Sequence, residues 1–296
     1  MKKKSIIISI LLICSMLLSF TPMIFGNYAT ATTGAANFLP NTFISGLDTL
    51  NETAISTSTA NYITSLLNGR YPNRVFPDIN TTIQSFNSKL SMVQSNYDQV
   101  AVFSKGHRGV PAPGHISLAD YSNYVGNQIT DYNHIFPLTS SSKNVVTFIW
   151  HCETAYPYNT NGVNWDSLGA AGMPYAWTHN SGMNKYGTTG SQVYLGWTSR
   201  TYVKVYDYNI KDYTNATVMG GYLIGSPQYE WGINPQCNYA NVAGAFWYYM
   251  SQGYSVKDSL NEMSKAVYNN PNIAFTSTDL NNWLIVWGNW NMGLPP

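Results

Sequence analysis

Two short apolar runs constrain the fold of this chain more than any other feature. Residues 100–103 and 145–149 are rich in β-branched side chains and are bounded by polar or glycine residues. Runs of this length and composition are typical of strands buried in a parallel sheet. One run leads to His107 in the sequence SKGHRG, and the other leads to Cys152 in the sequence WHCETA. Because ligands of open α/β sheets bind beyond the carboxyl ends of the strands, we expect His107 and Cys152 at one functional edge.

The rest of the chain alternates between strand-like and helix-like patterns. The expected strands cover residues 54–59, 73–76, 193–198 and 283–287, and the expected helices cover 62–68, 165–171, a segment capped by Asn80, and two segments around 242–249 and 256–267. Gly253 is placed to end the first of the last two helices, and Ser255 with Asp258 to begin the second as a capping box. This alternation predicts an α/β fold with a mainly parallel sheet that helices cover on both faces.

The N-terminus has the pattern of a secretory signal peptide. Three lysines precede an apolar stretch at residues 5–20, and Ala29-Thr30-Ala31 offers a cleavage site. We therefore expect residues 1–31 to be a signal peptide, 32–50 to be a flexible segment or pro-segment, and 51–296 to form one domain with an insertion at about 199–236. The protein would be secreted, or held at the outer surface of the cytoplasmic membrane if the signal stays uncleaved. No later segment approaches the roughly 20 apolar residues that a spanning helix needs.

Charge is too sparse for a polyanionic partner. Charged residues make up 10% of the chain and the net charge is +1, so neither nucleic acid nor an anionic membrane surface is an expected partner. Glycosylation sequons at Asn51, Asn80 and Asn215 are consistent with export. We expect no metal or other cofactor, because His115, His134 and His179 lack ligand spacing, and we expect Asp120, Asp131 and Asp166 to cap helices or turns.

Beyond the signal peptide the chain keeps two cysteines, Cys152 and Cys237, and two interpretations of them stay open. In an exported protein such a pair often forms a disulfide. Alternatively, Cys152 is a nucleophile, because a thiol displayed past a strand end beside an imidazole suggests a Cys-His dyad.

These residues resemble the caspase-hemoglobinase fold of clan CD cysteine peptidases. The resemblance rests on the strand ending in Gly-His, the second strand ending before Cys152, and the segment GYSVKDSL that opens an amphipathic helix. Cys152 follows His107 by 45 residues, close to the about 50 residues found in caspases. The sequence FIWHCETA looks most like CHAT-type, gingipain-like and separase-related members. The resemblance implies a caspase-like three-layer sandwich with a mainly parallel six-stranded sheet.

The resemblance also implies a mechanism and a set of site residues. Cys152 would attack a peptide carbonyl, and His107 would protonate the leaving amine. The Cys152 N–H with that of Arg108 or Gly109 would hold the oxyanion, each donor being worth roughly 3 kcal/mol of barrier. Candidate substrate-pocket residues follow the strand ends: Trp150, His151, Glu153, Trp197 and Ser199. By strand alternation His151 should face away from Cys152, so it is either a substrate contact or a structural residue. Glu153 either lines the pocket or caps a helix.

Three functions remain at this point. The first is a secreted cysteine endopeptidase that acts on a peptide or protein substrate. The second is a non-catalytic surface, adhesion or binding protein of the same fold, with Cys152 in a structural role. The third is an unrelated exported hydrolase or sugar-binding α/β protein.

Overall fold

A mostly parallel sheet runs through the fold, with its strands in the order β13-β10-β7-β3-β1-β2. The computed structural model describes residues 33–40, 52–119, 128–140, 143–198, 201, 204–207, 212–215 and 239–295, with the backbone alone for 33–40, 52–55, 204–207 and 212–215. The strands are β1 (Thr33–Pro40), β2 (Val75–Thr81), β3 (Gln99–Lys105), β7 (Asn144–Trp150), β10 (Val193–Trp197) and β13 (Leu284–Gly288). β13 pairs antiparallel with β10, and the other pairs are parallel.

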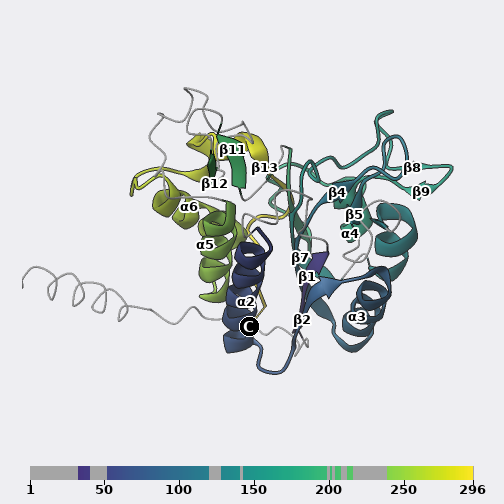
Figure 1. Ribbon diagram of the computed structural model, residues 1–296, viewed down its shortest axis with the longest axis horizontal. Helices are drawn as coiled ribbons and strands as arrows, with labels where there is room; N and C mark the ends of the chain where they lie inside the picture. Colours follow the sequence, from purple (N-terminus) through teal and green to yellow (C-terminus); the bar gives the residue numbers. More distant parts are fainter. Residues whose placement is uncertain are drawn as a thin grey trace, which may run out of the picture. The chain divides into compact units, whose positions relative to one another are not determined.

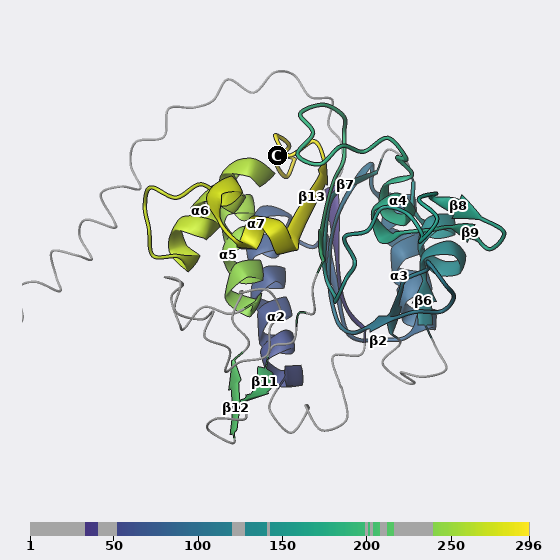
Figure 2. The ribbon, with the colours of Figure 1, turned by 90° about the horizontal axis from the view of Figure 1, so that it is seen from above.

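Helices cover both faces of this sheet (Figures 1 and 2). On one face lie α2 (Glu52–Arg70), α5 (Tyr239–Ser251) and α6 (Val256–Val267), and on the other lie α3 (Ile83–Asn96) and α4 (Met173–Thr178). The connections carry shorter elements: β4 (Arg108–Gly109), β5 (Ser117–Ala119), β6 (Gln128–Thr130), η2 (Asp131–Ile135), η3 (Phe136–Leu138), β8 (Trp165–Asp166), β9 (Gly169–Ala170), β11 (Lys204–Asp207), β12 (Asp212–Asn215), η5 (Phe275–Ser277) and α7 (Leu280–Trp283).

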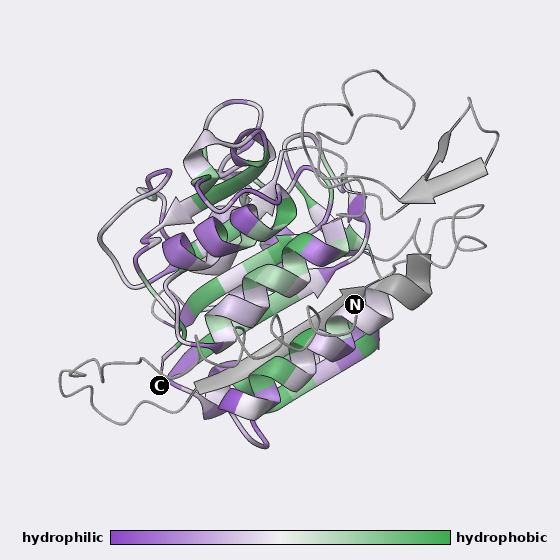
Figure 3. Ribbon diagram, turned by 90° about the vertical axis from the view of Figure 1, so that its left-hand side faces the viewer, coloured by the Kyte–Doolittle hydropathy of each residue, from purple (hydrophilic) through white to green (hydrophobic). Residues whose placement is uncertain are grey.

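Alternation along the central strands builds a separate hydrophobic core on each face. Phe148 stacks on Phe103 and on Phe246 of α5, with ring centroids 5.9 and 5.2 Å apart. The next residue, Ile149, belongs to the opposite core with Trp177 of α4. The helices facing the viewer in Figure 3 alternate hydrophobic and hydrophilic residues, as expected of elements that bury one side.

The structure confirms a mixed α/β fold with a mainly parallel sheet. The strands that lead to His107 and Cys152 are β3 and β7, and β10, α5, α6 and β13 lie where the pattern predicts them. Ser255 is the N-cap of α6, with its Oγ accepting the Asp258 N–H at 3.0 Å. Gly253 follows α5 with a φ of 91°.

Several local predictions are wrong. Residues 54–59 lie in α2 rather than in a strand, because Ala60, Ile63 and Leu67 bury one side of a longer helix. Residues 165–171 form the β8–β9 hairpin instead of a helix, with Gly169 at a φ of 123°. Asn80 lies in β2, and Thr82 caps α3 in its place.

One strand of the sheet comes from the segment that precedes the expected domain. Residues 33–40 belong to the segment expected to precede the domain, and they form β1 between β2 and β3. The expected signal peptide, Ser199, Cys237 and most of the expected insertion lie outside the described residues. Within the described part of the chain, no helix has the length and apolar character needed to cross a membrane.

Candidate functional site

His107 and Cys152 occupy equivalent places at the ends of neighbouring strands. β3 and β7 pair in parallel, and Lys105 is the register partner of Trp150. His107 lies two residues after Lys105, and Cys152 lies two residues after Trp150. The Gly106 N–H donates to the Trp150 carbonyl at 3.4 Å, which continues the pairing past the last strand residues. The two loops therefore leave the sheet side by side, as the sequence predicts.

Two side-chain interactions connect these loops. The Arg108 guanidinium forms an ion pair with the Glu153 carboxylate. His151 Nδ1 lies 3.0 Å from the His107 carbonyl oxygen, and His151 Nε2 lies 2.9 Å from Ser104 Oγ. The residue after His107 and the residues on both sides of Cys152 thus hold the two loops together.

His151 is fully buried, and its surroundings favour the neutral imidazole. Burial lowers the pKa of its imidazole well below the ordinary value, and the positive charge of Lys105 adds to that effect. A carbonyl oxygen only accepts hydrogen bonds, so Nδ1 carries the proton and donates to His107. His151 points toward Ser104, on the sheet face opposite to the one that Trp150 joins. This agrees with the orientation expected from strand alternation.

Cys152 lies against Thr201. The Thr201 N–H donates to Cys152 Sγ at 3.2 Å, and Thr201 Oγ1 is 3.8 Å from the same sulfur. Trp150 Nε1 donates to the Thr201 carbonyl at 3.2 Å. Cys152 is partly exposed and forms no disulfide among the described residues. The expected disulfide partner, Cys237, is outside them.

The turn that carries Cys152 has a constrained backbone. Glu153 has a φ of 52°, in the left-handed region that non-glycine residues seldom adopt. Thr154 Oγ1 donates to the His151 carbonyl at 3.1 Å. The Glu153 side chain forms the ion pair with Arg108, and the Thr154 hydrogen bond spans the turn from the next residue. They support a sharp turn that exposes the Cys152 side chain at the strand end.

The β4–β5 ladder gives the Arg108 and Gly109 N–H groups opposite directions. The Ala119 N–H donates to the His107 carbonyl at 3.0 Å, and Arg108 pairs next with Leu118. Hydrogen-bonded and non-hydrogen-bonded pairs alternate in an antiparallel ladder. The Arg108 N–H therefore points away from β5, whereas the next residue, Gly109, points its N–H toward β5. Of the two alternatives for the second oxyanion donor, the Arg108 N–H is the one that is not directed into the β4–β5 ladder.

The expected pocket residues differ in accessibility. Trp150 and Trp197 are fully buried, with centroids 6.4 and 5.0 Å from the Tyr239 ring, so they form part of the core beneath the site. His151 is buried as well, and Glu153 keeps 30% of its side chain exposed. Burial leaves the first three without side-chain surface for a substrate in this structure.

Sequence reasoning missed two residues of the site. Thr201 contacts the sulfur from 49 positions away. Lys105 is fully buried with its Nζ 5.0 Å from the centre of the Trp150 ring, a cation–π contact. Its position at the end of β3 was the only sequence signal.

A second polar cluster lies outside these two loops. His115 Nδ1 is 3.0 Å from Asp131 Oδ1, and His115 Nε2 is 3.0 Å from Asp166 Oδ2. Asp131 accepts N–H groups from Ile116 and Gly172, and burial raises its pKa. The two aspartates cap backbone groups, as expected, and also hold His115. Among the described residues, no group of acidic, histidine or cysteine side chains is arranged to hold a metal ion.

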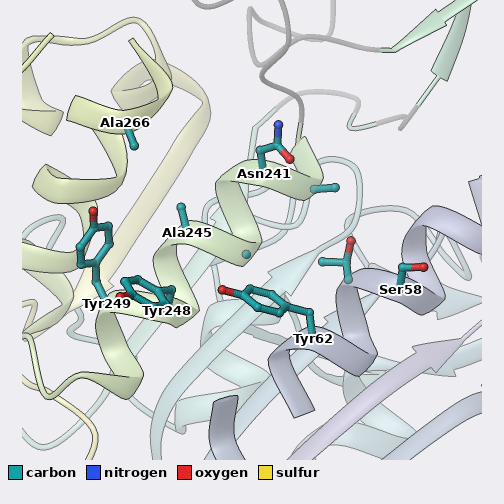
Figure 4. A pocket seen from close by; sticks show the side chains of 10 residues that line it. Ser58, Tyr62, Asn241, Ala245, Tyr248, Tyr249 and Ala266 are labelled. Atoms are coloured by element: carbon teal, nitrogen blue, oxygen red, sulfur yellow. The ribbon is translucent and has the colours of Figure 1, made fainter. Parts of the chain in front are cut away.

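An open groove lies on the helical layer instead of at the strand ends (Figure 4). Its volume is about 540 Å³, and it is lined by Ser58, Thr59, Tyr62, Ala240, Asn241, Gly244, Ala245, Tyr248, Tyr249 and Ala266. These residues belong to α2, α5 and α6. The groove contains neither His107 nor Cys152, so it is separate from the candidate site.

No protein-family model matches the chain, and no curated protein matches it either.

Proposed function

We propose that the protein is a secreted cysteine endopeptidase of the caspase-like fold, with Cys152 as nucleophile and His107 as general acid and base. The observation that carries this proposal is the register of β3 and β7. Lys105 pairs with Trp150, so His107 and Cys152 each lie two residues beyond the same register pair. A mainly parallel sheet with helices on both faces supports the proposal, and the caspase-like three-layer sandwich is part of what is proposed. Arg108, Glu153 and His151 hold the two loops in a common orientation.

The reaction would proceed in two steps. Cys152 Sγ attacks the scissile carbonyl carbon, and the C–N bond breaks as His107 gives a proton to the leaving amine. Water then attacks the thioester, assisted by His107, which releases the carboxylic acid and regenerates the thiol. The Cys152 and Arg108 N–H groups would face the oxyanion during both steps.

A non-catalytic relative is the second candidate. It is favoured by the burial of His107, which is 3% exposed, and by the Thr201 hydrogen bond to the Cys152 sulfur. Catalysis by the first candidate requires the loops to admit a substrate beside both side chains. Catalytic hydrogen bonds often tighten only when substrate binds, so the apo arrangement is compatible with the peptidase.

Covalent labelling separates the two candidates. The secreted protein is treated with a series of peptidyl acyloxymethyl ketones, and the modified residue is identified by mass spectrometry. The peptidase requires a thioether at Cys152, no label at that position in Cys152→Ala, and much slower labelling in His107→Ala. His134→Gln is a matched histidine control in η2 and should label at the wild-type rate. Absence of labelling in a folded wild-type protein would favour the binding protein.

A further inference from the structure

We propose that His151 is a positioning residue for His107, tying the loop of the general acid to the strand end of the nucleophile. This inference rests on the proposed function. It deepens that function by explaining how the histidine is held in place. His151 is fully buried and both of its ring nitrogens have partners, so its role differs from contact with the substrate.

The hydrogen bonds fix one tautomer of His151. Nδ1 donates to the His107 carbonyl oxygen at 3.0 Å, because that oxygen only accepts. Nε2 is then an acceptor, and the Ser104 hydroxyl can rotate to donate to it at 2.9 Å. The His107 carbonyl therefore sets the proton position, and the Ser104 hydroxyl is compatible with it.

The His107 carbonyl has donors on two different elements. Ala119 of β5 donates at 3.0 Å, but β5 belongs to the same connection that follows His107. His151 lies at the end of β7, next to Cys152. Of these two donors, His151 is the one that couples the His107 backbone to the strand end that carries the proposed nucleophile.

Burial favours the neutral imidazole that this coupling requires. The buried imidazole stays neutral because desolvation disfavours its charged form, so the Nδ1–H donor and the Nε2 acceptor both persist. A histidine of this kind orients a catalytic group without exchanging protons with it. Such positioning is enough to affect the reaction, because a displacement of about 1 Å can lower the rate about 100-fold.

Two amide substitutions separate the directed hydrogen bond from packing. Asn places its NH₂ group near the Nδ1 position of histidine, whereas Gln reaches the Nε2 position. We expect His151→Asn to retain the bond to His107 and to label within about threefold of wild type, and His151→Gln to label about 10-fold to 100-fold more slowly. The measurement is the second-order rate of Cys152 labelling by a peptidyl acyloxymethyl ketone, on proteins with matched thermal melts.

A double-mutant comparison makes the assignment specific to His107. If His151 acts through His107, then His151→Gln should cause no further slowing in a His107→Ala background. Equal slowing in both backgrounds, or equal rates for His151→Asn and His151→Gln, would overturn the assignment. In that case His151 supports the Cys152 loop or the core.

The same data distinguish this inference from the proposed function. Wild-type labelling that is absent, or unaffected by His107→Ala, means that the peptidase proposal fails and the positioning role fails with it. Labelling that depends on His107 but is unchanged in His151→Gln defeats the positioning role alone. Long-range ¹H–¹⁵N spectra provide a readout independent of activity: near neutral pH we expect a neutral Nδ1–H tautomer, and an Nε2–H or charged ring contradicts the inference.

Discussion

Arg108 and Glu153 are partly exposed, with 28% and 30% of their side chains accessible, yet they connect the two candidate catalytic loops. An exposed ion pair contributes about 0–1 kcal/mol to stability, so its main effect should be on loop geometry. We expect Glu153→Gln to slow labelling of Cys152 several-fold while the thermal midpoint changes little. The charge-reversed pair Arg108→Glu with Glu153→Arg should recover part of the rate.

The chain offers a matched control for this substitution. Lys265 and Glu262 form an ion pair of similar exposure on α6. Glu262→Gln should leave the labelling rate unchanged. If Glu262→Gln slows labelling to a similar extent, the effect of Glu153→Gln comes from the change in net charge and not from the ion pair.

His151 should also make stability depend on pH. Its pKa is lowered in the folded state, so below about pH 6.5 the unfolded chain binds a proton that the folded chain does not. The free energy of unfolding should therefore fall on acidification, by up to about 1.4 kcal/mol per pH unit from this group. Urea denaturation of wild type and His151→Asn at several pH values tests this. The free energy of unfolding should depend less steeply on pH in the variant between about pH 6.5 and 5. If the variant and wild type have the same slope there, a buried, neutral histidine is contradicted.

Among individual residues, the sequence predicts the location of those that come directly after a strand. His107, Cys152 and the orientation of His151 depend on strand alternation and parallel pairing, which local patterns specify. Thr201 is different, because its contact with Cys152 joins segments 49 residues apart. Lys105 is also different, since a lysine is almost never fully buried unless it is paired.

At the scale of elements, the connection between β3 and β7 is held by the His115 cluster and by Gly172. Gly172 has a φ of 91°, and a Cβ there would lie 2.5 Å from the Pro157 carbonyl carbon and 2.7 Å from the Tyr158 nitrogen. Its N–H donates to Asp131 Oδ2 at 3.1 Å. Backbone atoms cannot rotate away as a side chain can, so this position requires glycine.

We expect Gly172→Ala to destabilise the protein by more than the about 1–3 kcal/mol of a strained backbone conformation alone. Gly190→Ala is the matched control, because Gly190 has a φ of 98° with open space around its Cβ position. Chemical denaturation of both variants measures the difference. Equal losses would show that the close approach to Pro157 and Tyr158 carries no cost.

The elements that were predicted incorrectly share a physical cause. Residues 54–59 contain β-branched and small polar side chains that suit a strand, but propensity is a weak preference and the buried side of α2 overrides it. In residues 165–171 the deciding feature is local: Asp166 Oδ1 accepts the Leu168 N–H at 2.8 Å, and Gly169 takes a positive φ. Long, periodic helices such as α6 have both local and tertiary preferences in agreement, so they were predicted correctly.

At the scale of the whole fold, β3 and β7 contribute to both cores, because adjacent residues of one strand bury their side chains on opposite faces. Phe148 belongs to the core of α2, α5 and α6, and Ile149 belongs to the core of α3 and α4. Loss of packing on either side should therefore be transmitted through the strand that the two cores share. We therefore expect the two cores to unfold together as one cooperative unit.

Ile149→Ala tests that cooperativity. The substitution should cost about 2–5 kcal/mol, since it removes buried methyl and methylene groups from a packed core. Hydrogen exchange followed by mass spectrometry should show the same loss of protection for the slowest amides of α5 as for those of α3, although Ile149 lies on the α3 face. A loss confined to α3 and α4 would mean that the two faces open independently. In that case the His107 and Cys152 loops, which leave strands shared by both cores, would be anchored by one face alone.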